Sequence, residues 1–238
     1  MYTAFELLAR EFYSDDLTIL IKFPSRSRPE KLVDTFQKYI SLASNTSLIS
    51  VLISLDKDDS TVSTELIQRL KSIHPSTQVH VGEPCGKIGA INRDMEEAGP
   101  YDILLLASDD MIPVQYGYDK LIRNHMKNYY PDLDGVLWYN DGFKGPLLNT
   151  LCILGKTYYN RFGYIYHSSY KSLYCDNEFM DVAKRLGKQT YIDHVIIKHE
   201  HPLATGQERD ALYQVNQTFV QTDFHNFLDR RSKGFPSF

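Results

Sequence analysis

Short segments that are almost entirely apolar alternate with amphipathic segments through the first half of the chain, and this alternation restricts the possible folds more than any other feature. The apolar segments are residues 17–23, 48–55, 78–81 and 101–107. Between them, apolar residues recur at helical spacing from Pro29 onward, over 62–73 and over 88–98. Strands that are apolar along their whole length are covered on both faces, and regular strand–helix alternation is typical of parallel pairing. We therefore predict an α/β fold with a mostly parallel central sheet flanked by helices.

The second half of the sequence predicts a less regular set of elements. We expect strands at 135–140, 150–154 and 190–197, a helix at 176–186 and a long helical segment from Gln207 onward. A chain of 238 residues can bury a sizeable core as one domain, so the last helical segment is expected to form a C-terminal extension of that domain.

Composition and charge exclude several classes of protein. Hydrophobic residues make up 42% of the chain and charged residues 24%, and the formal net charge is -4, so the basic excess of a general nucleic-acid-binding protein is missing. The N-terminal sequence does not have the pattern of a signal peptide, and we find no apolar stretch long enough to cross a membrane. Cys85, Cys152 and Cys175 are odd in number and widely spaced, which argues against a disulfide framework or a zinc–thiolate site. We expect a cytoplasmic protein.

Polar side chains follow three of the predicted strands, at the edge of the sheet where open parallel sheets bind ligands. They are Pro24 to Arg28 after the first strand, Asp56, Asp58 and Asp59 after the second, and Ser108, Asp109 and Asp110 after the fourth. The first loop, in FPSRSRPE, contains no glycine, so it lacks the G-x-G-x-x-G pattern that lets a backbone approach the pyrophosphate of a dinucleotide. A diphosphate bound at this edge would need another source of positive charge, and a divalent cation is the usual one.

Asp109 and Asp110 are the candidate ligands of such a cation. Paired carboxylates at the rim of a central strand suit Mg²⁺ or Mn²⁺, which bind to one or two carboxylates together with phosphate oxygens. Two aspartates at such a place also commonly cap the following turn. His199 and His201, at the end of the predicted strand 190–197, offer an imidazole ligand, and Mn²⁺ accepts a mixed carboxylate–imidazole set. The other interpretation of these histidines is a structural one.

Taken in chain order, six segments resemble the GT-A glycosyltransferases, most closely the family-2-like group. They are PSRSRPEKL, SLDKDDST, GKIGAIN, ASDDM, YCDNEF and KHEHP, within about residues 17–203. Each segment alone is a weak signal, whereas their order and spacing together are fairly specific. The resemblance implies one GT-A-type (Rossmann-like) domain over residues 1–238. Its parts would be a nucleotide-binding half at about 17–115, an acceptor-binding and catalytic half at about 116–203, and a helical extension at 204–238.

The resemblance also implies an activity and its ligands. The chain would act as a hexosyltransferase, moving a sugar from a nucleotide diphosphate sugar to a hydroxyl of a carbohydrate or another acceptor, with Mn²⁺ or Mg²⁺ as cofactor. The donor-binding residues would be Pro24, Ser25, Arg28, Asp56, Lys87, Asn92, Ser108 and Asp109. Among them, Asp56 matches an acid that accepts a hydrogen bond from a uracil N–H, which favours a UDP-sugar. Asp110 would bind the metal, with His199 or His201 as the second protein ligand.

The remaining roles concern the acceptor. Asp176 matches the carboxylate that acts as general base in inverting members, although an aspartate at a helix start is also a common N-cap. Trp138, Asn140 and Asp141 lie in the region where the acceptor sugar meets the protein, and the tryptophan would equally suit the core.

Two other functions remain open from the sequence. A sugar nucleotidyltransferase shares this sheet arrangement but normally carries a glycine-rich, basic loop after the first strand, and PSRSRPE lacks the glycines. A non-catalytic domain that binds nucleotides or carbohydrates would have no need to keep Asp109, Asp110, Asp176 and the two histidines. The final helical segment also leaves the formation of oligomers open.

Overall fold

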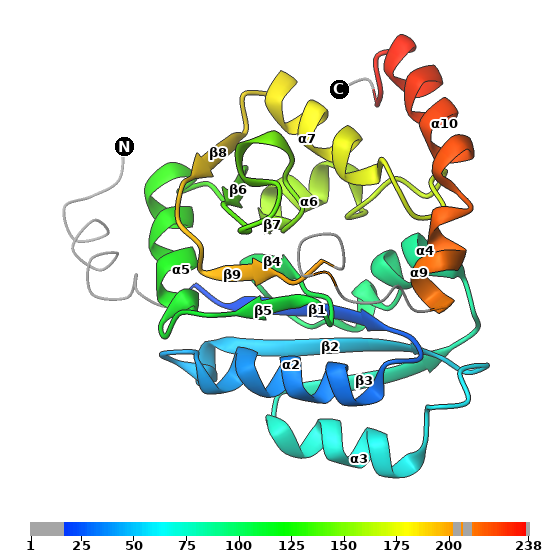
Figure 1. Ribbon diagram of the computed structural model, residues 1–238. Coiled ribbons are helices and arrows are strands. Elements are labelled where there is room, and N and C mark those ends of the chain that lie inside the picture. The colour runs from blue at the N-terminus through cyan, green and yellow to red at the C-terminus, as the bar shows by residue number, and fades with distance from the viewer. Residues whose placement is uncertain (1–16, 202–205, 207–210, 237–238) are drawn as a thin grey trace, which may run out of the picture.

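The computed structural model describes residues 17–201, 206 and 211–236 (Figure 1). The first half contains β1 (Ile19–Ser25), α2 (Pro29–Ser41), β2 (Ile49–Asp56), α3 (Thr64–Ile73), β3 (Thr77–Gly82), α4 (Gly86–Asn92) and β4 (Ile103–Leu106). The second half contains β5 (Met111–Pro113), α5 (Tyr118–Tyr129), β6 (Val136–Tyr139), β7 (Ile153–Gly155), α6 (Lys156–Phe162), α7 (Cys175–Arg185), β8 (Gln189–Ile192), β9 (Ile197–His199), α9 (Ala211–Gln217) and α10 (Val220–Ser232). Three short 3₁₀ turns, η1 (Thr46–Leu48), η2 (Met95–Glu97) and η3 (Gly145–Leu147), lie between them.

Seven strands form one sheet in the order β3-β2-β1-β4-β7-β6-β8. Within the described residues, β7 alone runs antiparallel to its neighbours β4 and β6. The other pairs are parallel, and β5 and β9 form a separate antiparallel pair. The predicted α/β fold with a mostly parallel sheet is therefore confirmed. Because β7 is antiparallel to both of its neighbours, β4 and β6 run in the same direction. The carboxyl ends of β1, β2, β4, β6 and β8 therefore all reach the same edge of the sheet.

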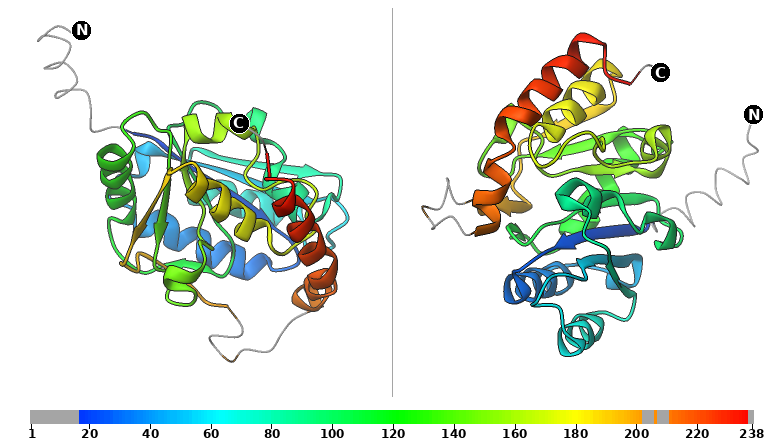
Figure 2. Two further views of the ribbon diagram at one scale, coloured as in Figure 1. Left: turned by 90° about the horizontal axis from the view of Figure 1, so that it is seen from above. Right: turned by 90° about the vertical axis from the view of Figure 1, so that its right-hand side faces the viewer.

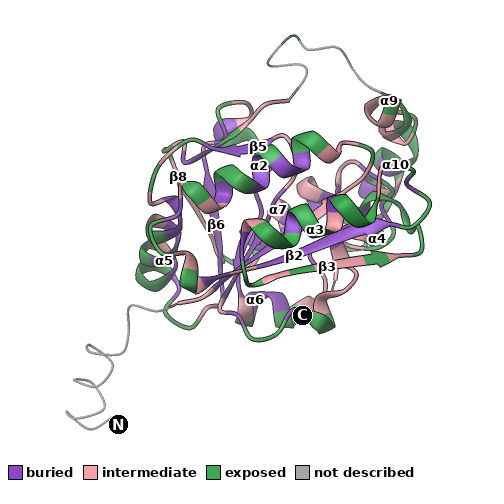
Figure 3. Cartoon of the chain, turned by 90° about the horizontal axis from the view of Figure 1, so that it is seen from below, coloured by how far each residue is buried: buried purple, intermediate pink, exposed green. Residues whose placement is uncertain are grey.

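Helices cover both faces of this sheet. On one face α2, α3 and α5 bury Phe36, Leu70 and Ile122 against alternate residues of β1 such as Ile21. On the other face α4, α6, α7 and α10 pack over the cluster that contains Leu20 of the same strand. Figure 3 shows the outer sides of α2 and α3 exposed and their inner sides buried. In Figure 2, α7 and α10 lie side by side on the second face. Full burial on both faces accounts for the continuous apolar strands in the sequence.

The predicted helix over 88–98 is interrupted. It begins earlier, at Gly86, and ends at Asn92, and η2 follows after a break. Asp94 within the break has φ 65°, a left-handed conformation that an α-helix cannot continue through. Its carboxylate accepts a hydrogen bond of 2.5 Å from the hydroxyl of Ser54 on β2. A contact between distant parts of the chain thus stabilises the break, which local periodicity could not reveal.

Three other predicted elements differ from the structure. The strand expected at 190–197 is wrong as a single element, because β8 pairs with β6 in the large sheet and β9 pairs with β5 in the small one. The strand expected at 150–154 begins only at Ile153. Part of the helical segment expected from Gln207, residues 207–210, lies outside the described residues. The rest is divided between α9 and α10, where the Thr218 N–H and hydroxyl both bond to the Val215 carbonyl, at 3.1 and 2.7 Å.

Asp134 fastens the start of β6 to α6 and to the residue that precedes β8. Its carboxylate accepts a 2.6 Å hydrogen bond from Arg161 Nε and lies 2.9 Å from Lys188 Nζ. The hydrogen bond from Arg161, opposed by burial, lowers the pKa of Asp134 from 3.8 to about 2. The ionised carboxylate therefore contributes stability above a pH of about 4, and this contribution is lost as the pH falls from about 4 to about 2.

We expect Asp134→Asn to reduce the free energy of unfolding by about 2 kcal/mol at pH 7. The loss relative to the wild type should shrink as the pH approaches 3, because the Asp134 carboxylate of the unfolded chain is then protonated while the folded protein still holds it ionised. Urea unfolding at pH 7 and pH 3 measures both effects. Asp132→Asn is the matched control, since the Asp132 carboxylate is 62% exposed and lies 4.0 Å from the same lysine. A loss of the same size in both variants would contradict the prediction.

Candidate active site

Ion pairs join the loops that leave β1, β2 and β4 at one edge of the sheet. Arg28, after β1, donates from Nη1 to Asp109 Oδ1, after β4, at 2.9 Å. Arg26 donates from Nη1 to Asp56 Oδ2, at the end of β2, at 2.8 Å. Parallel pairing of β1 with both neighbours places these strand ends together. The strand-end residues that the sequence analysis selected therefore meet, with Pro24 and Ser25 as the last two residues of β1.

Asp56 is held by two arginines. It is 5% exposed, and besides the contact with Arg26 its Oδ1 accepts a 2.9 Å hydrogen bond from Arg93 Nη1. Arg26 also binds Asp58 through both guanidinium nitrogens, at 2.5 and 3.0 Å. Sequence reasoning missed Arg93. The available signal was its position immediately after the GKIGAIN segment, which the resemblance already placed beside the nucleotide.

A buried lysine forms a hydrogen bond to the backbone of Arg93. Lys22, in the middle of β1, is fully buried, and its Nζ donates to the Arg93 carbonyl at 2.9 Å and to the Ser54 hydroxyl. Ser54 in turn donates to Asp94, whose carboxylate lies 3.4 Å from Arg93 Nε. Burial lowers the pKa of Lys22 to about 8, with the charge of Asp94 acting in the opposite direction. The polar chain links the core of the sheet to the arginine that faces Asp56.

The two aspartates after β4 occupy different environments. Asp109 pairs with Arg28, and its backbone carbonyl accepts a 3.1 Å hydrogen bond from the Thr35 hydroxyl. Burial raises the pKa of Asp109, while Arg28 opposes that shift. Asp110 accepts a hydrogen bond from the Ser108 hydroxyl. Burial disfavours its charge, yet His199, Ser108 and Lys87 hold the pKa of Asp110 well below the usual range.

His199 lies between two carboxylates. Its Nε2 is 3.6 Å from Asp110 Oδ2 and its Nδ1 is 3.4 Å from Asp141 Oδ2, with 11% of the side chain exposed. Pairing of β9 with β5 sets this position, because His199 faces Met111, the residue after Asp110. Burial disfavours the imidazolium, but the two carboxylates raise the pKa of His199 to about 9.

Asp110 and His199 are the residues that fit a divalent cation. The histidine Nδ1 is buried and makes no hydrogen bond, and Nε2 faces the Asp110 carboxylate without a short hydrogen bond between them. One carboxylate and one imidazole suit Mn²⁺, which completes its coordination with water and phosphate oxygens. Within residues 17–201, 206 and 211–236, no three His, Cys, Asp or Glu side chains form a complete metal site. Coordination of a cation by Asp110 and His199 stays a prediction.

His201, the other predicted ligand, stacks on Phe143. The two ring centroids are 4.7 Å apart with an interplanar angle of 9°, and the His201 ring is 5.2 Å from that of His199. Its ring also lies 5.6 Å from that of Tyr213 on α9. The stack of His201 on Phe143 connects the segment that follows β9 to the loop after β6. A role for His201 as a ligand stays a prediction.

Asp141 organises the loop after β6. It is 1% exposed, and its Oδ1 accepts hydrogen bonds from the backbone N–H groups of Phe143, Lys144 and Gly145, at 2.9, 2.7 and 3.0 Å. Thr150 donates to the other carboxylate oxygen. Burial opposes its charge, but His199, Thr150 and these N–H groups hold the pKa of Asp141 far below the usual range. The structure thus shows a loop-forming role, and direct contact with an acceptor stays a prediction.

The other two residues of the predicted acceptor region make contacts with the segment around β8. The Asn140 side chain donates from Nδ2 to Asp193 at 2.8 Å, and its Oδ1 accepts a hydrogen bond from the Gly142 N–H at 2.9 Å. Trp138 is 8% exposed and packs edge-on against Tyr191, with centroids 4.9 Å apart. The indole therefore has the burial of a core residue, while Asn140 lies at the end of the strand.

Asp176 is the second residue of α7, so it is not the N-cap, which is Tyr174. Burial raises the pKa of Asp176, and the charges of Lys87 and, more weakly, His199 act in the opposite direction. Lys87, in the first turn of α4, also acts on Asp110. The charge of Lys87 therefore acts on two carboxylates, Asp110 and Asp176, that come from separate segments of the chain.

Asn92 connects α4 to the loop before α7. Its amide nitrogen donates to the Tyr166 carbonyl at 2.6 Å, and its oxygen accepts from the N–H groups of Ile165 and Tyr166, at 2.9 and 3.2 Å. The predicted contact between Asn92 and a donor is not tested by these bonds. These bonds attach α4 to the segment that leads to Asp176.

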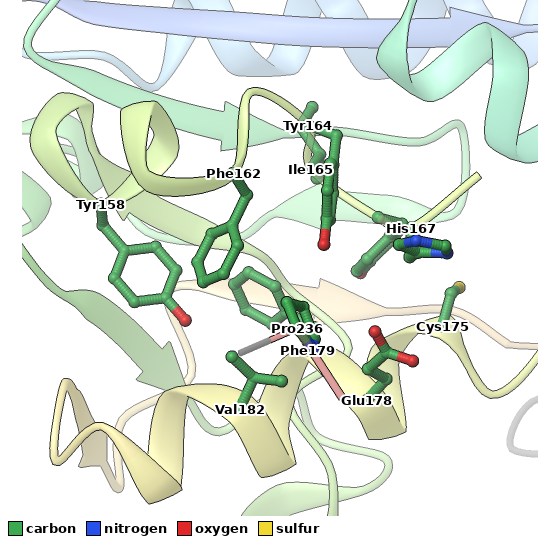
Figure 4. Close-up of a pocket in the computed structure, with 11 residues that line it drawn as sticks. Tyr158, Phe162, Tyr164, Ile165, His167, Cys175, Glu178, Phe179, Val182 and Pro236 are labelled. Atoms are coloured by element: carbon green, nitrogen blue, oxygen red, sulfur yellow. The ribbon is translucent and has the colours of Figure 1, made fainter. Parts of the chain in front are cut away.

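A separate pocket lies between α6 and the inner side of α7 (Figure 4). It is lined mainly by aromatic and aliphatic side chains: Tyr158, Phe162, Tyr164, Ile165, Tyr166, His167, Cys175, Glu178, Phe179, Val182 and Pro236. None of the predicted site residues lines it. The candidate active site is therefore the polar edge of the sheet and not this apolar pocket.

The sheet order, the layers of helices and the acidic loop after β4 define the GT-A-type glycosyltransferase fold. TarS residues 1–349 from S. aureus match with a TM-score of 0.61 and 12% identity, over 78% of this chain and 61% of that one. The same TarS fragment in complex with UDP-GlcNAc matches with a TM-score of 0.63 and 12% identity, over 82% and 60% of the two chains. The mannosyltransferase PcManGT from Pyrobaculum calidifontis, in complex with GDP-Man and Mn²⁺, matches with a TM-score of 0.65 and 11% identity, over 95% and 71%.

These comparisons confirm the predicted resemblance at the level of the fold. The chain spans 61% of the length of the TarS fragment. No family model and no curated protein sequence matches it. In the described part of the chain, no helix has both the length and the apolar character needed to cross a bilayer.

Proposed function

We propose that this chain is a metal-dependent glycosyltransferase that moves a sugar from a nucleoside diphosphate sugar, with UDP as the preferred nucleotide, to an acceptor hydroxyl. One observation carries the proposal: the Asp110 carboxylate faces the His199 imidazole, 3.6 Å away, at the edge of the sheet that also holds Asp56 and the Arg28–Asp109 ion pair. Cation ligands, a cationic side chain and a carboxylate with a raised pKa are together what transfer from a diphosphate requires.

The nucleotide would lie over the loops after β1 and β2. Asp56 would accept a hydrogen bond from an N–H of the base, with Arg26 and Arg93 on either side of the carboxylate. Arg28 and Lys87 would add positive charge near the phosphates, and Arg28 is already oriented by its bond to Asp109. Such prearranged charges act on the transition state without the cost of reorganisation.

Asp110 and His199 would hold the divalent cation. A divalent cation held by these two residues would supply the positive charge that offsets the negative charge developing on the leaving diphosphate. Asp110 stays ionised in the free protein, so its carboxylate would repel a diphosphate bound beside it. A cation between the two removes this repulsion, which supports the assignment.

Asp176 would act as the general base on the acceptor. The acceptor oxygen forms a bond to the anomeric carbon, the bond between that carbon and the diphosphate oxygen breaks, and the hydroxyl proton moves to the Asp176 carboxylate. A single displacement of this kind inverts the anomeric configuration. Burial that raises the pKa of Asp176 makes it a stronger base than an exposed aspartate. The acceptor would approach along the loop that Asp141 organises, near Asn140 and Trp138.

A thermal-shift screen with Mn²⁺ tests the proposal as a whole. A ligand that binds only the folded state at about 100 times its Kd stabilises it by about 2.7 kcal/mol. For a domain of this size, that corresponds to a rise in Tm of roughly 5–10 °C. We expect this rise with UDP or UDP-GlcNAc plus Mn²⁺, a smaller one with GDP or GDP-Man, and almost none when EDTA replaces the metal.

Two results would contradict the proposal. Turnover of a nucleoside triphosphate with a sugar phosphate would indicate a sugar nucleotidyltransferase. Binding without release of UDP from any nucleotide sugar, with or without acceptors, would indicate a non-catalytic binding domain.

A further inference from the structure

The last described helix, α10, is attached to the segment that carries Asp176. In Figures 1 and 2, α10 runs alongside α7 although about forty residues separate their starts in the sequence. Arg230 of α10 binds Glu178 of α7 through two hydrogen bonds, at 2.6 and 2.7 Å. Glu178 also accepts a 2.7 Å hydrogen bond from the Tyr170 hydroxyl. The two helices are therefore joined by buried, charge-assisted bonds, which are among the stronger kinds.

Asp223, near the start of α10, is the centre of this attachment. Its side chain is fully buried, and its carboxylate accepts hydrogen bonds from three consecutive backbone N–H groups. These are Lys171 N at 2.9 Å, Ser172 N at 2.8 Å and Leu173 N at 2.8 Å. Each of these N–H groups would lose its partner if the carboxylate were removed, and a buried N–H group without a partner destabilises the loop.

The bonded loop leads directly to a strained residue. Tyr174, the N-cap of α7, has φ 61°, which is unfavourable for a residue with a Cβ atom. Its ring packs against Phe224 and Phe227 of α10, with centroids 5.3 and 5.9 Å away. Asp176 follows two residues later. The backbone conformation at Tyr174 thus determines where the Asp176 carboxylate lies. Helix α10 fixes that conformation in two ways: its phenylalanines pack against the Tyr174 ring, and Asp223 binds the backbone just before Tyr174.

We propose that Asp223 is a positioning residue for glycosyl transfer: its three backbone hydrogen bonds fix residues 171–173 and, through Tyr174, the start of α7 that carries Asp176. This inference rests on the proposed function. Among the described residues, the hydrogen bonds of the Asp223 carboxylate all go to the loop at 171–173, so we expect Asp223 to contribute to the chemical step and not to the binding of the donor. The C-terminal helix is accordingly part of the catalytic half.

The test compares Asp223→Asn with Asp229→Asn in the full chain. Asp229 is an exposed residue on the same helix, paired with Lys233 at 2.7 Å, and therefore makes a matched control. With Mn²⁺ and UDP-GlcNAc as the probe donor, UDP release is measured as kcat and KM. We expect Asp223→Asn to lower kcat about tenfold or more with KM for the donor changed by less than about twofold, because misplacement by an ångström is enough for such losses. Asp229→Asn should leave both constants near the wild-type values.

Hydrogen exchange supplies a second measurement that does not require turnover. In the wild type, the amides of 171–173 should exchange as slowly as those within α7, and in Asp223→Asn they should exchange about tenfold faster or more. The Asp229→Asn amides should match the wild type. If Asp223→Asn does not fold, the wild-type protection of 171–173 still decides: rapid exchange there would overturn the inference.

The outcomes separate this inference from the proposed function. If Asp176→Asn loses activity while Asp223→Asn matches Asp229→Asn, the positioning role is wrong and the proposed function stands. If donor binding weakens together with kcat in Asp223→Asn, the residue acts on the whole fold and the positioning role is also wrong. If the wild type releases no UDP from any donor, the proposed function fails, and the inference that depends on it fails with it.

Discussion

Asp110→Ala is expected to abolish the metal-dependent part of UDP binding, a loss of affinity of about 100-fold or more when Mn²⁺ is present. The change removes one of the two proposed protein ligands, and an imidazole alone holds Mn²⁺ poorly against water. The diphosphate would then meet the edge of the sheet without the cation that offsets its charge. Calorimetric titration of UDP into each protein, once with Mn²⁺ and once with EDTA, measures the difference that the metal makes.

The control for this prediction is Asp58→Ala. Asp58 lies at the same edge and is bound by Arg26, so the variant removes an equal charge without removing a cation ligand. The ratio of affinities with and without Mn²⁺ should stay near the wild-type ratio in Asp58→Ala and collapse to about one in Asp110→Ala. Equal binding of UDP by the wild type and Asp110→Ala in the presence of Mn²⁺ would show that the metal assignment is wrong.

Asp176→Asn is expected to leave binding of UDP with Mn²⁺ within about twofold and to reduce transfer by about 10²–10⁴-fold, the usual contribution of a general base. The amide has nearly the same shape as the carboxylate but cannot accept the acceptor proton. Rates of UDP release under saturating donor, together with calorimetry, separate the two effects. In the wild type, the rate should fall as the pH drops through the pKa of Asp176, which burial raises above the usual aspartate range.

Asp181→Asn serves as the control on the same helix. Asp181 lies on α7 and pairs with Arg231 at 3.3 Å, at a place where that arginine is 54% exposed. Its replacement should leave transfer nearly unchanged. A wild-type rate in Asp176→Asn, or a loss of donor binding as large as that of Asp110→Ala, would remove Asp176 from the role of base.

The sequence was sufficient to predict the elements that depend on burial. β1 and β2 lie within two residues of their predicted limits, because an apolar run covered on both faces leaves a clear pattern. The grouping of Arg28, Asp56 and Asp109 at one edge followed from a rule about strand ends in parallel sheets. Each of these predictions needed only the local pattern and the topology.

Features that depend on partners distant in the sequence could not be predicted in this way. The break at Asp94 depends on Ser54, and the division of the expected strand at 190–197 depends on the pairing of β9 with β5. The binding of Asp56 by Arg93 and the attachment of Asp223 to the loop at 171–173 likewise join segments that share no pattern. The helices α5 and α6 were also missed, although the buried residues Tyr118, Ile122 and Met126 of α5 recur at helical spacing.

The single reversed strand, β7, has a consequence for how this protein can be altered. Because β4, β6 and β8 keep a common direction around it, the turns that enter these strands collect at the end of the molecule remote from the chemistry. Gly99 and Gly187 are two exposed examples, with no atom near enough to crowd an added side chain. A fluorophore or an affinity peptide inserted at such a turn would leave the reacting groups undisturbed.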